Sequence, residues 1–136
     1  MLASGCWMSH AGRANAAIAA ARRFADSTGV DYATNLLAQG RERADAEHLA
    51  VTFTEGDAEQ LPFPQASFDA TLSTVGVMFA PDQERAAAEL VRVTRAGGKI
   101  ALASWTPESL VGVLFKTVGL ALVQSCSAAS DLWWCP

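Results

Sequence analysis

The sequence predicts an α/β fold built on an open, mostly parallel sheet with helices on both faces. Three observations carry this prediction. Strand-like and helix-like segments alternate, the strand-like runs are rich in β-branched and aromatic residues, and acids stand just beyond two of them. The clearest alternation spans residues 51–105. Ligands on such sheets bind beyond the carboxyl ends of the strands, so we expect Asp57, just past the first run of this stretch, to touch a ligand.

The first half of the chain is expected to contain two helices and a short strand. Residues 14–24 are rich in alanine, the best helix former, whose small side chain lets a helix pack close to a sheet. Residues 27–30 are expected to form a brief strand that leads to Asp31. Residues 34–49 place an apolar face opposite a charged one and are expected to form a helix, with Thr34 as its N-cap.

Three strands are expected in the second half of the chain, at residues 51–54, 68–75 and 99–105. β-Branched and aromatic residues dominate the first strand. The second is apolar throughout its middle, so we expect it to be buried on both faces. Residues 56–67, which lie between these two strands, contain a glycine and two prolines and are expected to form a structured loop.

Two further helices are expected. Residues 82–94 would bury Ala86, Leu90 and Val93, which have the i, i+4, i+7 spacing of one helix face. Residues 110–123 are almost wholly apolar, yet too few to span a bilayer. An exposed apolar helix of this kind would favour self-association.

Composition argues against several classes of function. The chain has 136 residues, of which 51% are hydrophobic and 18% charged, as in a globular domain. Its net charge is −4 and it has no basic block, which argues against nucleic acid as a partner. Three cysteines without ligand-like spacing argue against a metal site or a disulfide scaffold. They favour a cytoplasmic location, as does the lack of signal-peptide features at the start.

No catalytic residue can be assigned from motifs. Nucleophile–base, metalloprotease and P-loop signatures are missing from the sequence. The two histidines, His10 and His48, are expected to have no catalytic role.

Four segments, taken in order and with their spacing, resemble the class I methyltransferases that depend on S-adenosylmethionine. They are GVDYATNLL (29–37), GDAEQLPFPQASFD (56–69), the strand and loop through Met78-Phe79, and LVRVTRAGGKIALASW (90–105). The resemblance runs from Asn15 to about Val118 and is closest to the branch of ubiquinone- and menaquinone-biosynthesis enzymes with a methyltransferase type 11 domain. It implies a Rossmann-like sheet, S-adenosylmethionine as cofactor, and a small organic molecule as methyl acceptor.

The resemblance also implies cofactor-binding residues. They are Gly12, Asp31, Tyr32, Asp57, Ala58 and Ser73. Asp31 would accept hydrogen bonds from both ribose hydroxyls, with Tyr32 beside the adenine. Asp57 would accept from the adenine amine and the Ala58 backbone N–H would donate to a ring nitrogen, while the backbone carbonyl of Ser73 would face the methionine amine. The alternatives are a helix-capping role for Asp31 and a turn role for Asp57.

The chain departs from the family pattern at its front. The family's loop reads as an acid, three residues, and then Gly-x-Gly. In residues 8–15 the acid position holds Met8, the first glycine is Gly12 and the second is replaced by Ala14. The preceding strand would be residues 2–7, which contain serine and glycine and form a poor strand for what is normally a central position.

The ends of the chain suggest an incomplete domain. No candidates for the family's last two strands follow residue 123, and both ends change abruptly in character. We therefore expect one partial methyltransferase-like domain over residues 1–136, consistent with a truncated or frame-altered gene product. Residues 1–13 would be a degraded first strand and loop, 14–123 the core, and 124–136 an irregular tail.

Three functions remain open. The first is methyl transfer to a small organic acceptor by in-line displacement. The second is a catalytically inactive methyltransferase-fold fragment that binds cofactor weakly or not at all, or serves as an interaction module. The third is a nicotinamide-dependent oxidoreductase, which the lack of a GxGxxG motif and the segment around Asp57 make less favoured.

Overall fold

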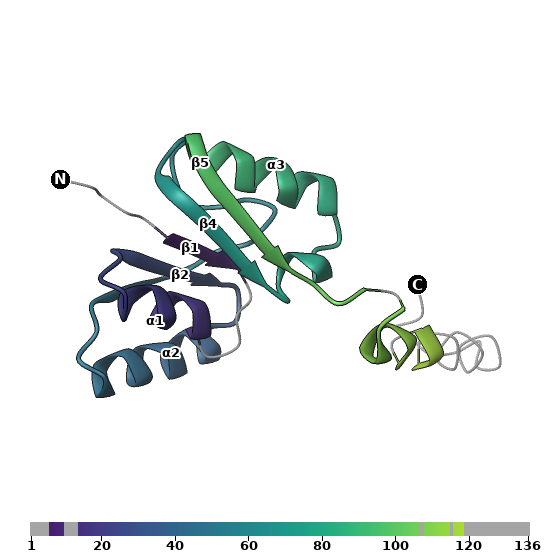
Figure 1. Cartoon of the computed structure of the whole chain (residues 1–136), viewed down its shortest axis with the longest axis horizontal. Coiled ribbons are helices and arrows are strands. Elements are labelled where there is room, and N and C mark those ends of the chain that lie inside the picture. The colour runs from purple at the N-terminus through teal and green to yellow at the C-terminus, as the bar shows by residue number, and fades with distance from the viewer. Residues whose placement is uncertain (1–5, 10–13, 107, 115, 119–136) are drawn as a thin grey trace. The chain divides into compact units, whose positions relative to one another are not determined.

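The computed structural model describes residues 6–9, 14–106, 108–114 and 116–118. The chain divides into two compact units, residues 1–104 and 105–136. The first unit contains the sheet and its helices (Figure 1). In the second unit, residues 110–114 and 116–118 are helical, in agreement with the start of the helix expected at 110–123. Gly12, the strand positions before residue 6 and the tail at 124–136 lie outside the described residues.

The first unit is built on a five-stranded sheet with the order β3-β2-β1-β4-β5, in which every neighbouring pair is parallel. The strands are β1 (Cys6–Ser9), β2 (Ser27–Asp31), β3 (Val51–Glu55), β4 (Phe68–Thr74) and β5 (Thr94–Ala103). The α/β prediction with a parallel sheet is confirmed. The strand order reverses between β1 and β4, and such a switch point creates a crevice at the carboxyl ends of the strands.

The first strand differs from its prediction. Among the described residues β1 covers Cys6–Ser9 and so ends two residues later than expected, which places Met8 and Ser9 in the strand and not in the loop that follows. β1 lies at the centre of the sheet, where Trp7 is opposite Thr28 of β2 and Thr71 of β4. Hydrogen-bond ladders on both sides override the poor local strand propensity of this segment.

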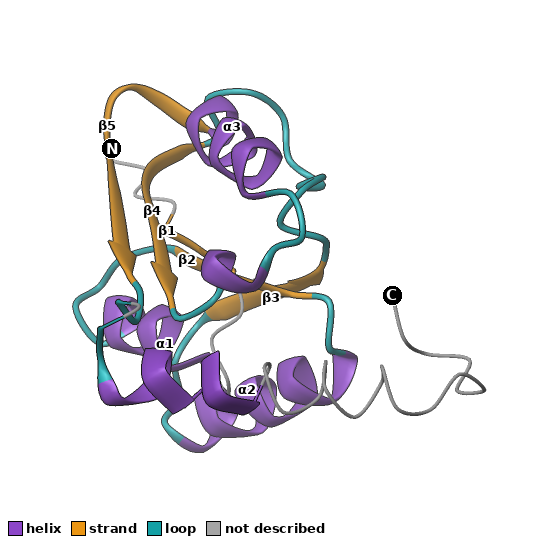
Figure 2. Cartoon of the chain, turned by 90° about the vertical axis from the view of Figure 1, so that its right-hand side faces the viewer, coloured by secondary structure: helices purple, strands orange, loops and turns teal. Residues whose placement is uncertain are grey.

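Helices cover both faces of the sheet. They are α1 (Asn15–Ala21), α2 (Thr34–Ala46) and α3 (Gln83–Val93), with a short 3-10 turn, η2 (Val77–Phe79), before α3. Figures 1 and 2 show α1 and α2 together on one side of the strands and α3 on the other. This arrangement is the doubly wound one that right-handed crossovers produce on either side of a switch point.

Each face has its own apolar core. On the α1 side, Ala14, Ala17 and Ile18 are buried, with Phe53 and other partly buried residues packed against them. On the α3 side the buried residues come from strands, helix and loop. They are Val30, Leu61, Phe68, Leu90 and Val93. The helix buries Ala86, Leu90 and Val93, which confirms the face predicted from their spacing.

Several boundaries need correction. The N-cap of α2 is Ala33, and Thr34 is the first helical residue. β4 is not buried throughout: Phe68, Thr71 and Ser73 are buried and its other residues are half-buried. β5 begins at Thr94, directly after α3, because the extra residues before Lys99 form an irregularity in its pairing with β4. Gly97 lies in that irregular stretch with a φ of 78°.

Candidate functional site

Asp31 ends β2 at the carboxyl edge of the sheet, and only 4% of its surface is exposed. Its Oδ1 accepts a hydrogen bond from the Ala33 backbone N–H at 2.8 Å, and its backbone carbonyl accepts one from Gly56 at 3.1 Å. Its Oδ2 is buried and has no hydrogen-bond partner among the described residues. A buried polar atom left unpaired costs about 1–3 kcal/mol, so this oxygen is a candidate acceptor for a hydrogen bond from a ligand.

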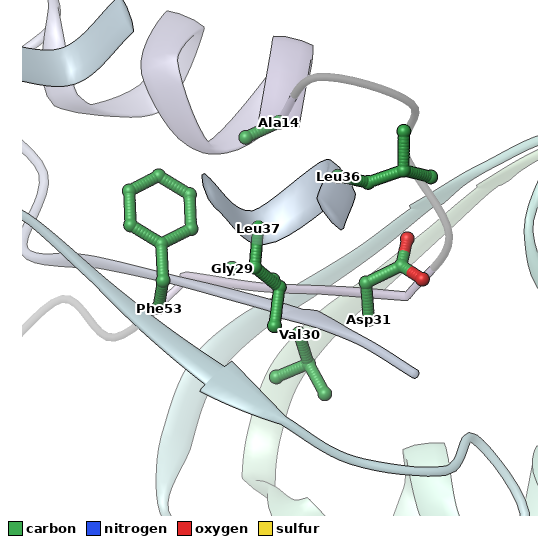
Figure 3. Close-up of a pocket in the computed structure, with 7 residues that line it drawn as sticks. All are labelled: Ala14, Gly29, Val30, Asp31, Leu36, Leu37 and Phe53. Atoms are coloured by element: carbon green, nitrogen blue, oxygen red, sulfur yellow. The ribbon is translucent and has the colours of Figure 1, made fainter. Parts of the chain in front are cut away.

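A narrow hollow lies beside Asp31. Its lining residues are Ala14, Gly29, Val30, Asp31, Leu36, Leu37 and Phe53. Figure 3 shows the Asp31 carboxylate at the Leu36 end of this hollow, away from the Phe53 ring. Its volume is about 10 Å³, which leaves room for roughly one water molecule and not for a cofactor.

A much larger hollow opens next to Tyr32, the residue that follows Asp31. Its volume is about 440 Å³, within the range of small-molecule sites. Its lining residues are Tyr32, Asp57, Ala58, Glu59, Phe79, Ala80 and Pro81. The fold therefore brings together Tyr32 from the end of β2 and the pair Asp57-Ala58 from the loop after β3, as their assignment to one site requires.

The Asp57 carboxylate faces partly into solvent, whereas Ala58 is 2% exposed. Asp57 Oδ1 accepts a hydrogen bond from the Glu59 backbone N–H at 2.9 Å, which forms a tight turn around Ala58. Asp57 therefore does stabilise a turn, as the alternative interpretation of this residue expected. It uses one carboxylate oxygen, and an ionised carboxylate has further acceptor sites for a ligand.

Of the two remaining predicted positions, Ser73 is among the described residues. Ser73 is buried in β4, opposite Ser9 of β1, and its Oγ accepts a hydrogen bond from the Val77 backbone N–H at 3.1 Å. It lines neither of the two hollows. Gly12 lies outside the described residues.

Two non-glycine residues near this edge have a left-handed backbone. Ala14, where the family pattern has its second glycine, has φ 57° and ψ 31° and is 8% exposed. Val75, directly after β4, has φ 58°. This region favours glycine, and strained residues concentrate at functional sites. At Ala14 the backbone has the left-handed conformation that glycine would adopt without strain.

Sequence reasoning missed some lining residues. Phe79 and Pro81 border the larger hollow, and Phe79 is 52% exposed. The available signal was the segment through Met78-Phe79, which carried part of the resemblance but received no role. Across the described ranges, no helix is long and apolar enough for a membrane span, and no three metal-ligating side chains gather.

Comparisons with known proteins agree on one family. Residues 9–102 match the family model described as "Methyltransferase domain". The chain is 43% identical over 125 residues to an uncharacterized protein of Mycobacterium tuberculosis, a match covering 91% of this chain and 46% of that protein. It is 37% identical over 90 residues to a demethylmenaquinone methyltransferase of Deinococcus radiodurans, covering 65% of this chain and 37% of that one.

A solved structure of a methyltransferase is also similar to this chain. The chain is similar to an S-adenosylmethionine-dependent methyltransferase of Thermotoga maritima, described as a possible histamine N-methyltransferase. The TM-score is 0.68 and the identity 25%, and the match covers 86% of this chain and 51% of that one. The chain thus spans about half the length of its relatives, or less.

Proposed function

The chain belongs to the methyltransferase domain family, and on that premise we propose that it binds S-adenosylmethionine and transfers a methyl group to a small organic acceptor. The observation that carries the proposal is the buried Oδ2 of Asp31, which has no hydrogen-bond partner within the described part of the chain. A ribose hydroxyl can donate to this oxygen and remove the cost of leaving it unpaired. The acceptor chemistry of Asp31 therefore matches a ribose hydroxyl, although the hollow beside it admits only a water-sized group in this structure.

The larger hollow supports the same assignment for adenine. Tyr32, Asp57 and Ala58 all line it, and these residues carry an aromatic ring, a carboxylate acceptor and a backbone N–H donor. An acceptor beside a donor matches the amine and the adjacent ring nitrogen of adenine. A nicotinamide-dependent oxidoreductase has no support from the family match.

Methyl transfer from S-adenosylmethionine requires little acid–base chemistry from the protein. The sulfonium of S-adenosylmethionine supplies an activated methyl group, so the role of the chain is to align donor and acceptor. The name of the Deinococcus relative makes demethylmenaquinone the first acceptor to test with radiolabelled cofactor.

Calorimetric titration of the full chain with S-adenosylmethionine and S-adenosylhomocysteine tests the proposal. Circular dichroism and size exclusion come first, to establish a folded sample and to measure the expected self-association. We expect micromolar binding that is lost in Asp31→Ala and Asp57→Ala. A folded protein that binds neither compound would overturn the proposal and favour the inactive-fragment alternative.

A further inference from the structure

The loop at residues 56–67, which we call the adenine loop, has little regular structure of its own. It joins β3 to β4 and carries Asp57 and Ala58. Its internal hydrogen bonds include those around the Asp57 turn and one from the Ser67 hydroxyl to the Pro64 carbonyl. Contacts with other elements must therefore fix the position of the loop relative to the sheet. The loop contacts α3.

Glu89 and Arg92 of α3 hold the middle of the adenine loop. Arg92 Nη1 donates to the Phe63 carbonyl at 2.7 Å, and Nη2 donates to the Leu61 carbonyl at 3.1 Å. Glu89 Oε2 accepts from the Leu61 backbone N–H at 2.8 Å. Both backbone polar groups of Leu61 are thus paired by these two side chains, while its side chain is buried in the core beside α3.

The two side chains also hold each other. Arg92 donates from Nε and Nη2 to the two carboxylate oxygens of Glu89, at 2.6 and 2.7 Å. The Arg92 hydrogen bond is the main cause that lowers the pKa of Glu89, and the same bond raises the pKa of Arg92. Both groups are therefore charged at neutral pH, and the forked geometry fixes their orientation.

A second contact holds the start of the adenine loop. Glu59, which follows Ala58, accepts at Oε1 from the Asp82 backbone N–H at 2.9 Å, at the N-terminus of α3. Its backbone carbonyl accepts from Arg85 Nε at 3.0 Å. An acid at this end of a helix is favoured by the helix dipole. Contacts with α3 thus lie at residue 59 and at residues 61–63, just beyond Asp57 and Ala58.

We propose that Glu89 and Arg92 are positioning residues for adenine recognition: they hold the adenine loop so that the Asp57 carboxylate and the Ala58 N–H face the edge of the base. They touch the loop and not the ligand. The inference rests on the proposed function, because it assigns adenine to the hollow beside Tyr32.

Arg92→Lys tests the inference, because lysine keeps the charge and loses the fork that pairs with Glu89 and two carbonyls at once. Arg22→Lys is the matched control. Arg22 also pairs through two hydrogen bonds with a glutamate, Glu47, at 2.7 Å each, but it lies just after α1 and away from the hollow.

The readout is discrimination between S-adenosylhomocysteine and S-inosylhomocysteine, in which a carbonyl replaces the adenine amine. A role limited to stability would not change this ratio. We expect the wild-type preference for the adenine compound to fall about tenfold or more in Arg92→Lys and to stay unchanged in Arg22→Lys. Amide hydrogen exchange of the free protein gives a second readout. Exchange at Leu61, whose N–H donates to Glu89, should become faster in Arg92→Lys alone.

The outcomes separate the two proposals. If the wild type discriminates and Arg92→Lys discriminates equally, with unchanged exchange in the adenine loop, the positioning role is wrong and the proposed function stands. If the folded wild type binds neither compound, both proposals fail. Faster exchange together with lost discrimination in Arg92→Lys supports the inference.

Discussion

Asp31→Asn should separate the stability of the fold from its capacity to bind cofactor. Asparagine is nearly isosteric, and its Oδ1 can keep the 2.8 Å hydrogen bond from Ala33. The substitution removes a carboxylate whose other oxygen is buried and has no partner among the residues that the structure describes. An unpaired charged group costs more than the 1–3 kcal/mol of a neutral one, and the amide nitrogen that replaces it is a neutral unpaired donor. We therefore expect the variant to be as stable as the wild type, or more stable by about 1 kcal/mol.

Cofactor binding should change in the opposite direction. Two ribose hydroxyls donating to a carboxylate contribute about 1.5–3 kcal/mol each. Their complete loss, at the lower value, is about 3 kcal/mol, or roughly 100-fold in Kd. Asparagine keeps one acceptor, so we expect the Kd for S-adenosylhomocysteine to rise about 10- to 100-fold.

Urea unfolding and calorimetric titration measure the two quantities on the same samples. Asp26→Asn is the control, because Asp26 is an exposed acid just before β2 and its substitution makes the same change in charge. Neither quantity should change in the control. If Asp31→Asn lost more than about 1 kcal/mol of stability and bound S-adenosylhomocysteine like the wild type, Asp31 would be a structural residue at the start of α2.

Three further predictions concern positions around the site. Ala14→Gly removes the strain of a left-handed alanine, which favours the folded state by about 1 kcal/mol. The loss of a buried methyl group and the greater freedom of the unfolded chain offset this gain. The free energy of unfolding in urea should therefore change by less than about 1 kcal/mol, while the affinity for S-adenosylhomocysteine rises. Gly40→Ala would put a Cβ 2.8 Å from the Phe53 ring, so the free energy of unfolding in urea should fall by about 1–3 kcal/mol despite the better helix propensity of alanine. A more stable variant would contradict this prediction. Arg92 lowers the pKa of Glu89, so this pairing stabilises the fold above the ordinary glutamate pKa of about 4.3, and the stabilisation is lost as pH falls through the lower pKa of the folded state. The difference in unfolding free energy between wild type and Glu89→Gln should therefore shrink from about pH 7 to about pH 3. A difference that stays constant with pH would contradict this prediction.

Local patterns predicted most of the fold. The helix expected at 82–94 is found at 83–93, because the spacing of its apolar residues and its N-terminal acids are properties of one segment. β1 and β5 were placed less well. A central strand is stabilised by its neighbours, and the irregularity at the start of β5 is a property of its pairing with β4. Neither property is visible in the strand's own residues.

The site residues, like the strands, were only partly predictable from local sequence. Asp31, Tyr32, Asp57 and Ala58 were identified because they follow strands in recognisable segments. The burial of Asp31 Oδ2 depends on the packing of the elements around it, so residue types alone could not predict it. The hydrogen bonds that hold the adenine loop join Leu61 to residues 28 and 31 positions later, a separation at which no local pattern exists.

The most direct test of a cofactor site at this edge is an amide NMR titration of the full chain with S-adenosylhomocysteine. We expect the largest shifts at Tyr32, Ala33 and Ala58, which lie beside the Asp31 carboxylate or line the larger hollow. A third hollow, lined by residues that include Phe24, Asp26 and His48, serves as an internal control and should not respond. Shifts confined to that third hollow, or no shifts at all, would contradict the assignment of the cofactor to Asp31 and the adenine loop.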